Sequence, residues 1–122
     1  MIRNFLLVGL GGGIGSIMRY ACSLVISSTY FPLSTLIVNI IGSLIIGLIA
    51  GISYKNETFL VSWKLFLATG ICGGFTTFSA FSIENLQFLQ NGKYLQGLTY
   101  ITGSIVLGIT AAWVGYKISG GS

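Results

Sequence analysis

Four long apolar segments dominate this chain, at about residues 5–26, 33–53, 63–89 and 94–116. Each is long enough for a helix to cross a hydrocarbon layer about 30 Å thick. Only 7% of the 122 residues are charged, whereas a soluble domain has about 25%. We therefore predict an all-α integral membrane protein with four transmembrane helices, built as a single domain over residues 1–122.

The remaining composition excludes several classes of function. The net charge of +4 comes from 6 basic and 2 acidic residues that form no cluster, so no nucleic-acid partner is expected. The chain has no histidine, no metal-ligand spacing and no nucleophile–base pair, so we do not expect an enzyme. Cys22 and Cys72 lie within apolar segments, which favours small core residues over a disulfide. No signal-peptidase-like site follows the first segment, so we interpret it as a retained span.

The third segment contains a stretch, Gly70 to Glu84, whose residues disfavour a continuous helix. Three of its residues are glycines, and each glycine inside a helix costs roughly 1 kcal/mol relative to alanine. Unwound backbone and polar side chains are unfavourable at membrane depth, so by default they mark a functional site. We predict a helix that is broken near its middle, from Gly73 to Thr76. The hydroxyls of this stretch belong to Thr76, Thr77, Ser79 and Ser82.

Phe78 and Phe81 directly follow the predicted break. Because they stand three residues apart, a helix places both rings on one face. Packing would explain a random pair of phenylalanines, but not a pair beside a polar, glycine-rich break. Glu84 ends the stretch and is the only acidic residue in any of the four segments.

The first segment contains a glycine cluster and a late arginine. The cluster does not fit a dinucleotide fingerprint, because no acidic residue follows at the required distance. Gly11-x-x-x-Gly15 instead predicts close packing between helices. Arg19 lies one turn later, and two interpretations remain open: an interfacial anchor whose charged end reaches the surface, or a cation at the mouth of an anion pathway.

The second segment places Thr35, Asn39 and Ser43 at four-residue intervals, which gives one polar stripe along a helix. Asn39 either bonds a neighbouring helix or lines a pore as a donor, and the sequence does not decide between them. The fourth segment has a comparable stripe along one side, formed by Gly97, Tyr100, Ser104, Gly108 and Gly115.

Charge is nearly balanced between the two ends of the predicted bundle. Both termini and the loop at 54–62 fall on one side with Arg3, Lys55, Lys64 and Lys117, and the opposite side carries Arg19 and Lys93. So small a bias orients a membrane protein only weakly. We therefore expect insertion in both orientations, which permits an antiparallel, dual-topology homodimer.

Three motifs in this order and spacing closely resemble the Fluc family of small fluoride channels, also called CrcB proteins. They are Gly12-Gly13-Ile14-Gly15-Ser16-x-x-Arg19-Tyr20, Thr35-x-x-Val38-Asn39-x-x-Gly42-Ser43 and Gly73-Gly74-Phe75-Thr76-Thr77-Phe78-Ser79-Ala80-Phe81-Ser82-x-Glu84. The likeness covers nearly the whole chain, and the third motif is the specific one. Ala80 stands where the family commonly has a hydroxyl residue, which removes one polar contact.

The resemblance implies passive fluoride efflux that protects the cell from fluoride toxicity, through two pathways in an antiparallel homodimer in the inner (plasma) membrane. It implies a structural sodium ion held by the main-chain carbonyls of Gly73 and Thr76. Further candidate site residues are Glu84, Thr77, Ser79 and Ser82. The residues that it assigns to the fluoride pathway are Phe78, Phe81, Asn39, Tyr100, Ser104, Thr35 and Arg19.

Two other classes of membrane protein share some of these features. A small proton-coupled multidrug exporter has similar size and topology, but it needs a membrane carboxylate, and the first segment has none. A purely structural assembly factor would explain the glycines but not Asn39 together with the broken third helix.

Overall fold

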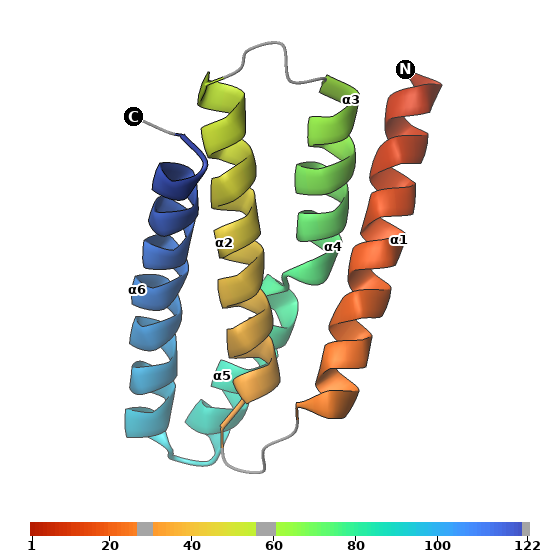
Figure 1. Ribbon diagram of the computed structural model, residues 1–122. Helices are drawn as coiled ribbons and strands as arrows, with labels where there is room; N and C mark the ends of the chain where they lie inside the picture. The colour runs from red at the N-terminus through yellow and green to blue at the C-terminus, as the bar shows by residue number, and fades with distance from the viewer. Residues whose placement is uncertain (27–30, 56–60, 121–122) are drawn as a thin grey trace.

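The computed structural model describes residues 1–26, 31–55 and 61–120, and every regular element in this part is helical (Figure 1). Four stretches of it are long and apolar enough to cross a membrane: Ile2–Val25, Leu33–Tyr54, Ser62–Gln90 and Tyr94–Ile118. The prediction of an all-α protein with four transmembrane segments is confirmed. The predicted turn at 27–32 and loop at 54–62 lie largely outside the described residues.

The chain order is α1 (Ile2–Val25), α2 (Leu33–Lys55), α3 (Val61–Lys64), η1 (Leu65–Cys72), α4 (Gly73–Phe75), α5 (Phe78–Gln90) and α6 (Tyr94–Ile118). The third span therefore consists of α3, η1, α4 and α5. In Figure 1, α2 and α6 lie side by side, α1 lies beside α3 and α4, and both termini lie at the same end. The bundle is thus two helix pairs joined through the third span.

Backbone-to-backbone contacts at glycines hold each pair together. A Cβ atom on Gly15 would collide with the Ile71 carbonyl oxygen, and one on Gly11 would lie 2.5 Å from the Phe66 carbonyl oxygen. The predicted close packing at Gly11-x-x-x-Gly15 is therefore confirmed, and its partner is η1. In the other pair, a Cβ on Gly47 would collide with the Ala112 carbonyl oxygen. Such small residues let membrane helices approach closely.

The third span is broken, but not where the sequence predicted. Gly73–Phe75 are helical, and the two extended residues are Thr76 (φ −80°, ψ 157°) and Thr77 (φ −149°, ψ 120°). The prediction that unwinding begins at Gly73 was therefore wrong. The physical reason is that Gly74 serves a close approach of two helices rather than an unwound backbone, since a Cβ there would collide with the Gly12 carbonyl oxygen.

The residues before the break form a π-helix, η1, which the sequence pattern did not predict. A π-helix inserts extra residues into an α-helical path and occurs often at functional sites. Here it carries Gly70 against Gly11, where a Cβ on Gly70 would lie 2.9 Å from the Gly11 Cα. The π-helical turn therefore belongs to the close α1–η1 contact.

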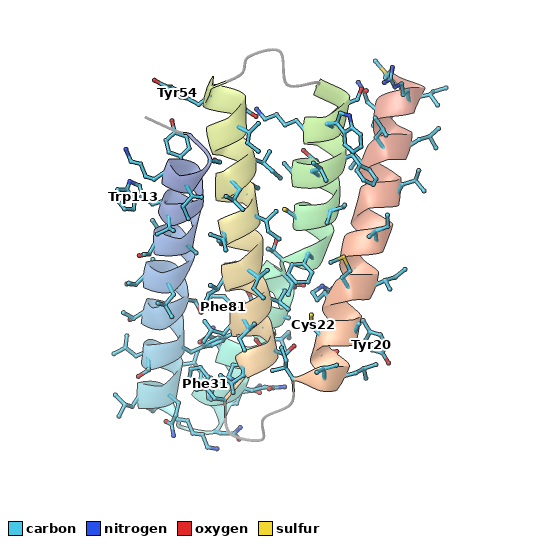
Figure 2. The ribbon with its side chains drawn as sticks, viewed as in Figure 1. Tyr20, Cys22, Phe31, Tyr54, Phe81 and Trp113 are labelled. Atoms are coloured by element: carbon cyan, nitrogen blue, oxygen red, sulfur yellow. The ribbon has the colours of Figure 1, made fainter. Side chains whose placement is uncertain are left out.

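The outer surface is apolar and the described core is small. Large hydrophobic side chains such as Phe5, Leu10 and Leu98 are mostly exposed, whereas Val38 and Tyr100 are fully buried. Figure 2 shows Tyr54 and Trp113 toward the end that carries the termini and Tyr20 near the opposite end. An apolar middle with aromatic residues near both ends is the pattern of a membrane-spanning bundle.

Candidate functional site at the broken third helix

A pocket of about 420 Å³ lies at the break, between α2, the two halves of the third span and α6. Seven residues assigned from the sequence to the site line it: Asn39, Gly73, Thr76, Thr77, Phe78, Phe81 and Ser104. The other lining residues are Gly42, Ser43, Ile46, Ala68, Cys72, Ile105 and Gly108. None of these lining residues carries a charge.

Asn39 holds the break through two hydrogen bonds to one residue. Its Oδ1 accepts from the Thr77 backbone N–H at 2.9 Å, and its Nδ2 donates to the Thr77 carbonyl oxygen at 3.2 Å. The sequence left two roles open for Asn39, and the structure shows the bond to a neighbouring helix. An amide nitrogen has two N–H groups, so Asn39, which lines the pocket, keeps a second N–H as a donor.

The break releases several main-chain carbonyls, including those of Gly73 and Thr76. In a continuous helix the N–H of Thr77 would bond the carbonyl of Gly73, and that of Ala80 would bond the carbonyl of Thr76. Instead, Thr77 donates to Asn39, and the Ala80 N–H donates to the Thr77 Oγ1 at 3.2 Å. Thr77 is thus the N-cap of α5. The freed carbonyls of Gly73 and Thr76 belong to the two residues that the resemblance assigns to a main-chain sodium site.

The aromatic pair lies on the first turn of α5. The ring centroids of Phe78 and Phe81 are 5.7 Å apart, with their planes inclined by 41°. Phe81 also packs against Tyr100 with centroids 5.0 Å apart (Figure 2 labels Phe81). Phe78 is 78% exposed, so this chain alone does not enclose it.

Glu84 gathers two of the predicted site residues from other helices. Thr35 Oγ1 donates to its Oε2 at 2.7 Å, and the Tyr100 hydroxyl donates to its Oε1 at 2.7 Å. Both donors are buried, at 8% and 1% exposure. The phenol ring of Tyr100 also packs edge-on against Phe31, with centroids 5.3 Å apart. Thr35, Tyr100 and Glu84 therefore form a hydrogen-bonded group, and none of the three lines the pocket.

Arg19 is half-buried, and its Nε donates to the Gly74 carbonyl oxygen at 3.3 Å. This carbonyl lies in the last turn before the break, where a cation is favourable because helix carbonyls point their negative ends there. Arg19 does not line the pocket. Of the remaining predicted residues, Ser79 Oγ lies 3.2 Å from Thr77 Oγ1, and Ser82 is exposed.

Ser43 is a pocket residue that the sequence-based site assignment missed. The signal was present, because Ser43 continues the four-residue spacing of Thr35 and Asn39. Ser104 was assigned, and its Oγ is buried without a hydrogen-bond partner within the described part of the chain.

These features define a small, multi-pass helical membrane protein with an uncharged polar pocket at a helix break. A family model described as "CrcB-like protein, Camphor Resistance (CrcB)" matches residues 6–116. The chain belongs to this family.

Curated relatives match over nearly their whole length. A "Fluoride-specific ion channel FluC" of Azobacteroides pseudotrichonymphae is 44% identical, with 98% of each chain covered. A protein of the same name from Flavobacterium psychrophilum is 45% identical over 97% of this chain and 98% of its own. Another of that name, from Thermus thermophilus, is 42% identical over 98% of this chain and 97% of its own.

Proposed function

We propose that this protein is a fluoride-selective channel in the plasma membrane, which lets fluoride leave the cell passively and so protects it from fluoride toxicity. The observation that carries the proposal is the pocket at the break. Its lining combines two phenylalanine rings with amide and hydroxyl groups and no charged side chain. The names of the relatives support the choice of fluoride.

The pocket chemistry suits a small anion that must bind and then leave. Fluoride is strongly hydrated, so a pore has to replace water with donors. The second N–H of Asn39 and the hydroxyl of Ser104 supply donors, and ring edges carry the positive part of the aromatic quadrupole. Because no lysine or arginine lines this pocket, the anion is stabilised without being trapped, as conduction requires.

Glu84 argues against the multidrug exporter. Such a protein needs a carboxylate that is accessible to protons and to a cationic substrate. Both carboxylate oxygens of Glu84 accept hydrogen bonds, from Thr35 and from Tyr100. No other acidic side chain is present within the four predicted spans.

Ion efflux from liposomes that contain the purified protein tests the function. Fast loss of fluoride, with little loss of chloride or uptake of protons, is the expected result. Replacing both rings in a Phe78→Ile, Phe81→Ile variant keeps apolar bulk but removes the quadrupole, so a folded variant should lose most fluoride flux. Methionine at the same positions is polarizable and should lose less. Full transport by the folded isoleucine variant would show that the rings only pack.

The functional unit is an antiparallel homodimer. Phe78 is 78% exposed although it lines the pocket, so a second copy is needed to enclose the pathway. The near-balanced charges of the two ends support insertion in both orientations. A single cysteine introduced after Ser122, in a variant without Cys22 and Cys72, should react with impermeant reagents from both sides of the membrane. Labelling from one side only would exclude this arrangement.

The released carbonyls of Gly73 and Thr76 fit a structural sodium ion. Main-chain carbonyls of unwound membrane helices coordinate Na⁺ in other proteins. One chain offers two such oxygens, and an isologous dimer would double the set at its axis. Replacing sodium by a large organic cation should lower the thermal stability of the dimer. Unchanged stability and transport after exhaustive replacement would rule the ion out.

A further inference from the structure

Helices α2 and α6 lie side by side and run in the same direction (Figure 1). Thr35 and Tyr100 meet at Glu84. Four residues further along each helix, Asn39 and Ser104 both line the pocket. Because four residues advance a helix by about 6 Å, these pairs form successive rungs.

The third rung pairs Ser43 with Gly108, so only one of its two residues has a side chain that can form a hydrogen bond. A Cβ built on Gly108 would lie 3.6 Å from Ser43 Oγ, and apart from the backbone of its own helix no other atom of the described residues would be within 4 Å of it. Both residues line the pocket. Helix α6, which supplies hydroxyls at Tyr100 and Ser104, therefore supplies none here, and the only hydroxyl of this rung comes from α2.

The ladder ends at the next rung. There Gly47 faces Ala112, and a Cβ on Gly47 would collide with the Ala112 carbonyl oxygen. With the two backbones in contact, no room is left between α2 and α6. Ser43 is therefore the last hydroxyl that this face of the bundle offers to the pocket.

The hydroxyls of the first rung already donate hydrogen bonds within the protein. Thr35 and Tyr100 each donate their single O–H to Glu84. One N–H of Asn39 is bonded to Thr77. The donors that α2 and α6 offer to the pocket are thus the second N–H of Asn39 and the hydroxyls of Ser104 and Ser43. Of the pocket hydroxyls on the third span, that of Thr76 donates to the Cys72 carbonyl oxygen, and that of Thr77 lies 3.2 Å from Ser79 Oγ.

From this geometry we infer that Ser43 is an anion-contacting residue of the pathway, whose hydroxyl takes the place of the one that α6 lacks at Gly108. The inference rests on the proposed function and adds a donor to it. Because positions 43 and 108 face each other, a hydroxyl at residue 108 should be able to contact the anion in place of the hydroxyl at residue 43.

Fluoride efflux from liposomes tests the exchange of the hydroxyl between helices. Ser43→Ala should lower the fluoride rate about tenfold, near the lower end of what a hydrogen bond to a charged group contributes. Adding Gly108→Ser to Ser43→Ala should restore most of the rate. Adding Gly108→Ala, which supplies the same Cβ without a hydroxyl, should not restore it. A merely structural role of Ser43 would not produce rescue by serine alone.

The matched control is Ser23→Ala, because Ser23 is exposed on α1 and its Oγ donates to the Tyr20 carbonyl of its own helix at 2.6 Å. It should conduct as the unmodified protein does. If the double variants do not fold, Ser43→Thr and Ser43→Val decide, since they share a shape and differ in the hydroxyl. Threonine should retain fluoride flux and valine should lose it.

The outcomes distinguish a failure of the role inferred for Ser43 from a failure of the proposed channel function. An unmodified protein that does not conduct fluoride would overturn the proposed function. Normal fluoride efflux through Ser43→Ala or Ser43→Val, alongside loss of efflux in the Phe78→Ile, Phe81→Ile variant, would overturn the inference and leave the channel intact.

Discussion

The two halves of the third span are held by different forces. The half before the break, η1 and α4, contacts α1 through glycine backbones, and neither partner leaves room for a Cβ at Gly15 or Gly74. The half after the break, α5, is held mainly by side chains from other helices. Asn39 bonds its N-terminal end, and Glu84 bonds Thr35 and Tyr100.

This difference separates stability from function along one segment. Close backbone contact is set by sterics, which tolerate no added atom but need no particular chemistry. Hydrogen-bonded side chains tolerate some change of shape but need their donors and acceptors. We therefore expect added atoms to damage the first half and lost polar groups to damage the second.

The largest effect is expected from Gly15→Ala. Its methyl group would collide with the Ile71 carbonyl oxygen and lie 2.8 Å from the Phe75 nitrogen. Overpacking against backbone should lower the free energy of unfolding by about 3 kcal/mol, seen as a lower thermal midpoint in detergent or loss of folded protein. Gly13→Ala is the control, because no atom of the described residues outside its own helix backbone lies within 4 Å of its Cβ position. Equal stability of the two variants would contradict the steric account.

An intermediate effect is expected from Asn39→Ala. It leaves the N–H and the carbonyl of Thr77 without their partners. Because Thr77 is only half-buried, each unsatisfied group should cost about 1 kcal/mol, the lower end of the range for buried groups. Both thermal stability and fluoride efflux should fall. Asn39→Asp keeps the acceptor for the Thr77 N–H but adds an anion to an uncharged pocket. It should therefore be more stable than the alanine variant and still conduct poorly. An aspartate variant with normal flux would show that Asn39 acts only on the backbone.

The smallest effect is expected from Thr77→Val, which removes the oxygen that caps the Ala80 N–H. Loss of an N-cap costs about 1 kcal/mol, so the thermal midpoint should fall slightly. Thr77→Ser keeps the oxygen and should match the unmodified protein. If valine were as stable as serine, the cap would not be what starts α5 at Phe78.

Several features of this protein follow from local sequence. The four apolar segments require membrane-spanning helices, because no soluble fold of this size could bury them. Gly11-x-x-x-Gly15 predicts a close helix contact, and the polar stretch after Gly70 predicts a break. The shared face of Phe78 and Phe81 follows from their spacing. Each of these depends on residues within a few positions of one another.

Contacts between distant segments were decided only by the tertiary structure. The sequence placed the start of the break at Gly73, because it could not show that Gly74 faces the backbone of Gly12. Nor could it show that Asn39, 38 positions away, accepts a hydrogen bond from the N–H of Thr77. That Ser43 and Gly108 face each other is likewise a contact between distant segments, which only the tertiary structure shows. Spacing fixes which residues share a helix face, but the register and approach of two helices are set by the small residues between them.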